Sequence, residues 1–138
     1  MGDPFKISWR VRFDEIDMQG VVHHPQIVTY LEIARLEFWR HLGISYRDMR
    51  TDGYEFIVHD LHVEYLKPLI FDEMVEVAVF IKSLSRASFV LGYEIRKETR
   101  QLAVKAEIEL VCARLNIPKP VALPIQFLKK LQIVYRTQ

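Results

Sequence analysis

The sequence is poor in cysteine and carries no excess of charge of either sign. Only one of its 138 residues is a cysteine, Cys112, so no intramolecular disulfide can form. Because disulfides belong to oxidising compartments, this favours a reducing one. Lys and Arg total 19 against 18 acidic residues, a formal net charge of +1. This near balance gives no bulk attraction to nucleic acid, which we do not expect as a partner.

Long apolar runs are also missing. No stretch approaches the ~20 residues that a membrane-spanning helix needs. Residues 1–4 lack the basic and apolar segments of a signal peptide. We therefore expect no membrane insertion and a cytoplasmic location. Without repeats, low-complexity tracts or linkers, residues 1–138 suit one domain.

What is present is a clear order of secondary-structure patterns. Apolar and polar residues alternate over 5–14, which predicts a half-buried strand. From Pro25 to Leu42 apolar residues recur every three or four positions around much of a helix, so a sheet is expected to wrap it. Pro25 suits its first turn and Gly43 its end. A second, short helix is expected over 45–49.

In the rest of the chain, apolar and polar residues alternate as they do in strands. Four are predicted, around 60–65, 75–81, 89–95 and 104–112, and polar turns at 83–86 and 97–100 make the last three hairpin neighbours. Prolines at 118, 120 and 124 are expected to end the sheet, and 124–132 to form an amphipathic helix. One central helix against an antiparallel sheet is an α+β architecture, and its open edges favour self-association.

A short acidic turn leads into the long helix. It reads Phe13-Asp14-Glu15-Ile16-Asp17-Met18-Gln19-Gly20-Val21-Val22-His23-His24-Pro25. The turn places the Asp17 carboxylate just ahead of a helix N-terminus, where unpaired N–H groups and a partial positive charge stabilise a developing oxyanion. A carboxylate there can attack a carbonyl or activate water. The segment is thus a candidate acyl-transfer or hydrolysis site; alternatively, Asp17 only accepts bonds from N–H groups of its own turn.

The motif Asp17-x-x-Gly20-Val21-Val22-x-His24, between a first strand and a long helix, resembles the hotdog-fold acyl-CoA thioesterases. The similarity is to the branch of 4-hydroxybenzoyl-CoA thioesterase and YbgC. Three further stretches resemble it, namely Leu31-Glu32-x-Ala34-Arg35, Val63-Glu64-Tyr65-Leu66-Lys67-Pro68 and Phe71-Asp72-Glu73. Three positions depart from its pattern, with His23 in place of tyrosine, Ile16 in place of a common threonine and Ile27 in place of a common aromatic residue.

The resemblance implies a hotdog fold, one long helix wrapped by an antiparallel sheet of five or more strands. It implies hydrolysis of an acyl-CoA thioester to a carboxylate and free coenzyme A, with no metal or other cofactor. Asp17 would act as nucleophile or general base, the backbone N–H of His24 would hold the oxyanion, and Gly20 would permit the tight turn. It also implies a homodimer joined edge to edge, often paired into a homotetramer, with active sites at the dimer interface.

Substrate contacts follow from the same resemblance. The acyl part is expected to meet residues around the turn and the helix start, namely Ile16, Val22, His23, Ile27 and Tyr30. The phosphates of coenzyme A are expected to meet basic residues of the third and fourth strands, with Lys82, Arg86 and Arg96 as candidates.

Several alternatives stay open at this point. Glu32 is a second candidate acid, because some hotdog branches place one on the helix, although it also suits an i, i+3 ion pair with Arg35. A hydratase or dehydratase is one rival function, and a non-catalytic module binding acyl-CoA or acyl-carrier protein is another. Asp14 and Glu15 do not have the spacing of a calcium loop and suit a solvated turn. Cys112 alternates with core positions, so we expect it to be buried and inert.

Overall fold

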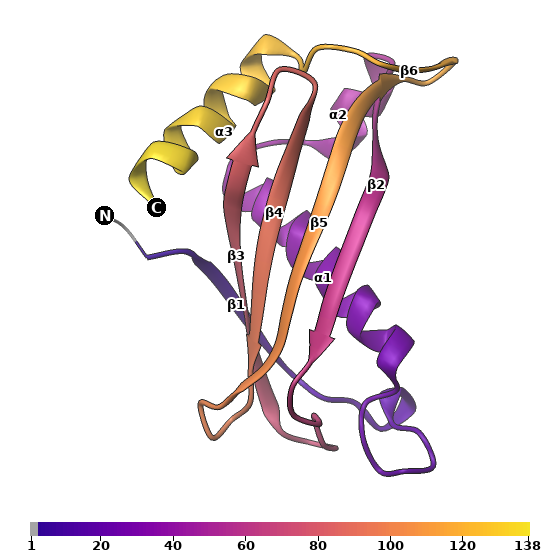
Figure 1. Ribbon diagram of the computed structural model, residues 1–138, viewed down its shortest axis with the longest axis vertical. Coiled ribbons are helices and arrows are strands. Elements are labelled where there is room, and N and C mark those ends of the chain that lie inside the picture. Colours follow the sequence, from indigo (N-terminus) through magenta and orange to yellow (C-terminus); the bar gives the residue numbers. More distant parts are fainter. Residues whose placement is uncertain (1–2) are drawn as a thin grey trace.

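The computed structural model describes residues 3–138, apart from the side chain of Pro118, and shows one long helix across one face of an antiparallel sheet (Figure 1). The elements in chain order are β1 (Phe5–Arg10), the 3-10 turn η1 (Phe13–Glu15), α1 (His24–His41), α2 (Tyr46–Thr51), β2 (Tyr54–Tyr65), β3 (Met74–Leu84), β4 (Ser88–Arg96), β5 (Leu102–Arg114), β6 (Ile117–Pro120) and α3 (Ile125–Thr137). The strand order is β1-β3-β4-β5-β2, and β6 pairs with β5.

The core lies between α1 and the sheet face that α1 covers. Alternate residues of β3, β4 and β5 point to this face because side chains of a strand alternate sides. At one end of the core an aromatic cluster joins four elements, with Phe56 5.2 Å from Phe89 and 4.8 Å from Phe127, and Trp39 5.6 Å from Phe89, between ring centroids. These contacts fix α1 and α3 relative to β2 and β4.

Much of the predicted architecture is confirmed. The long helix, the short second helix and the hairpin order of β3, β4 and β5 all form, and the C-terminal helix runs further than predicted. Within residues 3–138 no helix has both the length and the apolar character that crossing a bilayer requires.

Three expectations about strands were wrong. The first strand ends at Arg10, so Phe13 is not an inward residue and is 81% exposed. The strand expected from residue 60 begins at Tyr54. Its first half was not predicted because a bulge between Val58 and Asp60 breaks the alternation of apolar and polar residues. The prolines do not end the sheet, since β6 (Ile117–Pro120) pairs with β5. A short outer strand tolerates proline because few of its N–H groups need partners.

The loop between β2 and β3 is held by a buried carboxylate. Glu73 accepts hydrogen bonds from the backbone N–H of Ile70 at 2.7 Å and of Glu98 at 3.1 Å, and pairs with Lys97 at 2.8 Å. Burial alone would raise the pKa of Glu73, but these bonds together lower it. The ammonium of Lys97 also donates to the Pro68 carbonyl. The loop is therefore anchored to the β4–β5 hairpin.

We predict that Glu73→Gln destabilises the fold by about 1–3 kcal/mol at pH 7, because it leaves the Lys97 ammonium buried without its counter-ion. A lowered pKa means that the contribution of Glu73 is complete above the ordinary glutamate pKa of about 4.3 and is lost as the pH falls through the folded-state value. Urea unfolding at pH 7 and pH 3 should therefore show a difference that shrinks on acidification.

The matched control is Glu37→Gln, which breaks the exposed pair of Glu37 with Arg40. Exposed pairs contribute about 0–1 kcal/mol, so this variant should stay close to the parent. Equal stability of the Glu73 and Glu37 variants would contradict an anchoring role for Glu73.

Candidate active site

The acidic turn folds as a tight hairpin. The backbone N–H of Asp17 donates to the Val21 carbonyl at 2.9 Å, and the N–H of Gly20 donates to the Asp17 carbonyl at 3.0 Å. Gly20 has φ +81°, the left-handed region that closes a type I turn in a three-residue hairpin loop. Ile16 and Val22 then pair across the base of the hairpin. Asp17 thus sits at a fixed place in the turn.

This hairpin is fastened on two sides. On one side the N–H of Val22 donates to the Leu69 carbonyl at 2.8 Å, and Val21 bridges to Ile70 in the loop that Glu73 anchors. On the other side the N–H of His23 donates to the Glu15 carbonyl at 2.9 Å. The position of Asp17 relative to the start of α1 is therefore set by backbone hydrogen bonds.

The two carboxylate oxygens of Asp17 have different surroundings. Oδ1 accepts a hydrogen bond from the N–H of Gln19 at 2.8 Å, as expected of an aspartate that supports its own turn. Oδ2 lies 3.6 Å from Nδ1 of His23, and the Asp17 side chain is 25% exposed. One oxygen is thus held in the turn, and the other faces a solvent-accessible histidine.

His24 is the first residue of α1, and its backbone N–H takes part in no hydrogen bond among residues 3–138. This free donor lies at the positive end of an 18-residue helix. The hydroxyl of Tyr65 donates to the His24 carbonyl at 3.1 Å, and the two rings meet edge to face at 6.3 Å. In the sequence Tyr65 belongs to a predicted strand and to a family-like stretch. Its contact with the helix start is not predicted there, because that contact depends on how β2 ends.

A cavity of about 280 Å³ opens beside Asp17 and the start of α1. Its lining residues are Asp17, Gln19, Val21, Val22, His24, Ile27, Tyr65, Leu66, Lys67, Pro68, Leu69 and Val104. The predicted substrate residues Val22 and Ile27 lie here with Asp17 and His24. Ile16 and His23 line a more open hollow of about 500 Å³ that also contains Asp17. Asp17 therefore borders both spaces.

Four predicted substrate residues line neither of these two spaces. Tyr30 is fully buried, its ring packs edge-on against Trp9 at 5.1 Å, and its hydroxyl donates to Glu15 at 2.6 Å. Lys82 pairs with Glu107 on the sheet. Lys82 and Arg86 belong to the β3–β4 hairpin, which lies at the opposite end of the sheet from the turn before α1 (Figure 1). Arg96 pairs with Glu94.

Glu15 was expected in a solvated turn, but it is only 8% exposed. Its carboxylate accepts hydrogen bonds from the Arg12 N–H at 2.8 Å, from Tyr30 and, at 3.4 Å, from Gln26. Burial and then the bond to Glu15 raise the pKa of Tyr30. Asp14 is exposed, and its hydrogen bond with Arg12 lowers its pKa. Within residues 3–138 no three His, Cys, Asp or Glu side chains are placed to hold a metal ion.

Two other sequence expectations have clear outcomes. The ion pair between Glu32 and Arg35 is not formed among residues 3–138; instead, one guanidinium nitrogen of Arg35 is buried without a partner. Cys112 is fully buried as predicted, and burial raises the pKa of its thiol to about 11. A thiol with so high a pKa is a poor nucleophile.

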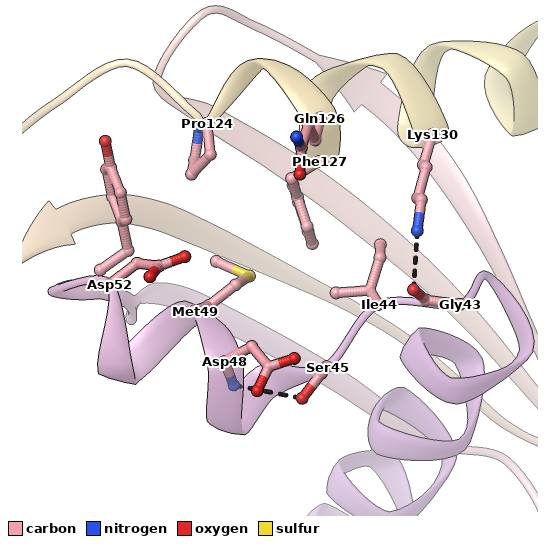
Figure 2. A pocket seen from close by; sticks show the side chains of 11 residues that line it. Gly43, Ile44, Ser45, Asp48, Met49, Asp52, Pro124, Gln126, Phe127 and Lys130 are labelled. Atoms are coloured by element: carbon pink, nitrogen blue, oxygen red, sulfur yellow. Dashed lines mark hydrogen bonds between the residues drawn. The ribbon is translucent and has the colours of Figure 1, made fainter.

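A separate cavity of about 200 Å³ lies between α2 and α3, far from the turn (Figures 1 and 2). Its polar groups already serve the fold. The Lys130 ammonium donates to the Gly43 carbonyl at 2.6 Å, and the hydroxyl of Ser45 caps α2 by accepting the N–H of Asp48 at 3.1 Å (Figure 2). We find no nucleophile and base held together there, so Asp17 marks the better candidate site.

The sequence model of a family described as the thioesterase-like superfamily matches residues 11–131. This chain belongs to that superfamily. The thioesterase-like chain is 33% identical to the acyl-CoA thioester hydrolase YbgC of Escherichia coli (strain CFT073) over 120 residues, 87% of this chain and 90% of the relative. The predicted hotdog fold and YbgC-like branch are thereby confirmed.

Solved structures give the same result. A hypothetical protein from Aquifex aeolicus has a TM-score of 0.87 and 37% identity, with 93% of this chain and 99% of the other covered. A DHNA-CoA thioesterase from Staphylococcus aureus has a TM-score of 0.85 and 32% identity, with 96% and 88% covered. The thioesterase-like chain thus shares its fold with these proteins over nearly all its length.

We predict that Gly20→Ala destabilises the thioesterase-like chain by about 1–2 kcal/mol, because alanine resists the left-handed conformation. An added Cβ would meet no atom within 4 Å, so the cost comes from the backbone alone. Gly20→Asn should cost less, since asparagine tolerates this region. Urea unfolding of the three proteins tests the order, and an alanine variant as stable as the parent would contradict the turn geometry.

Proposed function

We propose that this protein hydrolyses acyl-CoA thioesters at Asp17. The observation that carries the proposal is a carboxylate with one oxygen outside the turn's hydrogen bonds, beside the unpaired N–H that opens α1. Hydrolysis of a thioester needs a nucleophile or base and a donor for the oxyanion, and these two groups supply both. The name of the YbgC relative, an acyl-CoA thioester hydrolase, supports the same reaction.

The geometry suggests how the groups divide the work. Gln19 holds Oδ1 of Asp17, which leaves Oδ2 to attack the thioester carbon or to take a proton from an attacking water. The carbonyl oxygen becomes negative as the bond forms, and the His24 N–H at the helix end stabilises it. The carbon–sulfur bond then breaks, and the electron pair leaves with the thiolate of coenzyme A. In the nucleophilic route the acyl group is left on Asp17 as an anhydride, which water then hydrolyses to release the carboxylate and restore Asp17. Whether Asp17 is nucleophile or general base stays open.

The cavity beside Asp17 suits the apolar part of such a substrate. Val22, Ile27 and Leu69 are buried residues on its wall, and Tyr65 covers the helix start from the end of β2. Coenzyme A enters only as part of the substrate and leaves as product, and the chemistry needs no metal. The lone buried Cys112 suits the cytoplasm proposed as the location.

We predict that Asp17→Asn lowers kcat/KM for thiol release by about a hundredfold or more, because general-base and nucleophilic groups contribute on this scale. Thiol release from a panel of acyl-CoAs is followed with a thiol-reactive dye. Asp14→Asn is the matched control, since Asp14 is exposed and its side chain pairs with Arg12.

Equal turnover by the parent and the folded Asp17 variant would refute the mechanism, and Glu32 would become the next candidate for the catalytic acid. Binding of acyl-CoA without turnover by the parent would instead identify a non-catalytic module. A hydratase would consume an unsaturated acyl-CoA without releasing thiol.

We further propose that β2 joins β2 of a second copy to form a homodimer. β2 is an edge strand of the sheet, and its exposed apolar residues include Ile57, Val58 and Leu61 at 45%, 47% and 38% exposure. Leu36 on α1 is also exposed, at 39%. An edge of 12 residues with such side chains is a template for pairing with another chain. Pairing of two dimers into a tetramer stays a prediction.

Val58→Lys should convert the dimer to a monomer, because a charge on the edge opposes strand pairing. Sedimentation velocity measures the outcome. Ile133→Lys is the matched control, since Ile133 is an exposed apolar residue on α3, at 62% exposure, away from β2. A Val58 variant that sediments as the parent does would place the interface elsewhere.

A further inference from the structure

The side chain of His23 faces the free oxygen of Asp17. Nδ1 of His23 lies 3.6 Å from Oδ2 of Asp17, the carboxylate oxygen that takes part in no hydrogen bond among residues 3–138. This distance is too long for a direct hydrogen bond. Two polar atoms at such a separation are commonly bridged by a water molecule. The pair is therefore suited to hold a water between its two members.

The backbone of His23 is fixed, although its side chain is 55% exposed. Its N–H donates to the Glu15 carbonyl at 2.9 Å, and its own carbonyl accepts the N–H of Gln26 at 2.8 Å in the first turn of α1. The ring meets the ring of His24 edge to face at 5.0 Å. The side chain makes no capping hydrogen bond to the helix. The fold thus places the imidazole beside Asp17 without using its nitrogens to cap α1.

Asp17 borders two spaces of different character. The cavity of about 280 Å³ has buried apolar residues such as Val22 and Ile27 on its wall, together with His24 at the helix start. The hollow of about 500 Å³ is more open and contains both Asp17 and His23. An acyl group in the cavity would bring its carbonyl toward the His24 N–H, while water reaches Asp17 from the hollow. Thioester and water can therefore approach Asp17 from two different spaces.

The groups around the hollow decide which atom takes a proton from that water. Asp14, Glu15 and Asp17 line the hollow with His23, and the ring of His24 packs against His23 from α1. The carboxylates of Asp14 and Glu15 already accept hydrogen bonds from other side chains. Oδ2 of Asp17 and Nδ1 of His23 are then the acceptors for water. Histidine is the stronger base of the two, because its ordinary pKa of about 6.5 lies above the value of about 3.9 for aspartate.

We propose that His23 is a catalytic residue that takes the proton of the attacking water. The water donates one hydrogen to Oδ2 of Asp17 and the other to Nδ1 of neutral His23, which leaves a lone pair for the carbonyl carbon. As the oxygen–carbon bond forms, the proton moves to Nδ1, and the Asp17 carboxylate stabilises the imidazolium. The carbon–sulfur bond breaks with its electron pair on sulfur, and the imidazolium gives its proton to the thiolate. The acid product loses its own proton to solvent.

This role rests on the proposed thioesterase function and applies to both routes open to Asp17. In the nucleophilic route, Nδ1 takes the proton of the water that hydrolyses the anhydride. In either route His23 accepts a proton only while its ring is neutral. The kcat should therefore fall as the pH drops through about 6–7, where histidines take up a proton, whereas a carboxylate base alone would sustain turnover down to about pH 4.

The test is the pH dependence of kcat for thiol release by the parent, His23→Gln and His23→Tyr, the last with the tyrosine typical of the YbgC-like branch. At pH 8 both variants should lose about a hundredfold in kcat, the scale of general-base catalysis. Their remaining turnover should lack the fall at about pH 6–7. Because the hollow is open, imidazole added to His23→Ala should restore part of the lost activity.

His62→Gln is the matched control. The ring of His62 lies 3.6 Å from the carboxylate of Glu64, and its side chain is 67% exposed, so this pair repeats the separation of His23 and Asp17. The neighbouring Val63 packs against the core, so His62 points to the other face of the sheet. The control should keep the kcat and the pH profile of the parent.

The outcomes separate this role from the proposed function. An active parent whose kcat and pH profile are unchanged by His23→Gln would overturn the role of His23 and leave the thioesterase function intact. A loss of activity that keeps the fall at about pH 6–7, or that comes with a clear fall in Tm, would reveal a structural role and overturn it too. No thiol release by the parent from any acyl-CoA would refute the proposed function, and this proposal with it.

Discussion

The buried carboxylate of Glu15 is the contact on which the arrangement of the site depends. It accepts the N–H of Arg12 where β1 ends and the hydroxyl of Tyr30 from the middle of α1, while its backbone carbonyl accepts the N–H of His23. One residue therefore joins the first strand, the acidic turn and the long helix. Because hydrogen bonds to a buried charge are strong and directional, the turn cannot shift relative to α1 without breaking several of them.

A second anchor holds the turn from the opposite side and completes this constraint. Glu73 and Lys97 fix the β2–β3 loop, and that loop accepts the N–H of Val22. The carboxylates of the short acidic segment therefore have different roles. Glu15 holds the surrounding structure in place, while Asp17 keeps one carboxylate oxygen outside this hydrogen-bond network. A rigid frame around one accessible carboxylate oxygen is what preorganised catalysis requires, since no reorganisation is then needed as charge develops.

The sequence predicted those features that depend on local periodicity and turn chemistry. The alternation in β3, β4 and β5 and the three-to-four spacing of α1 reflect burial on one face, which a single sequence displays directly. The roles of Glu15 and Tyr65 were missed because each depends on a partner 15 or 41 residues away. The bulge in β2 hid half of that strand for a related reason, since it shifts the alternation from which strands are recognised. The motif around Asp17 was found because its spacing is local, whereas the placement of Tyr30, Lys82 and Arg86 depends on topology.

The edge formed by β2 links the proposed assembly to the proposed site. Tyr65 ends β2, donates its hydroxyl to the His24 carbonyl and lines the cavity beside Asp17. Its neighbour Val63 is only partly buried, so the end of β2 beside the cavity stays open along its free edge. A second copy joined along β2 would cover that edge next to the cavity. Exclusion of water strengthens the stabilisation of a developing oxyanion by fixed donors. Dimer formation and hydrolysis at Asp17 would then depend on the same strand.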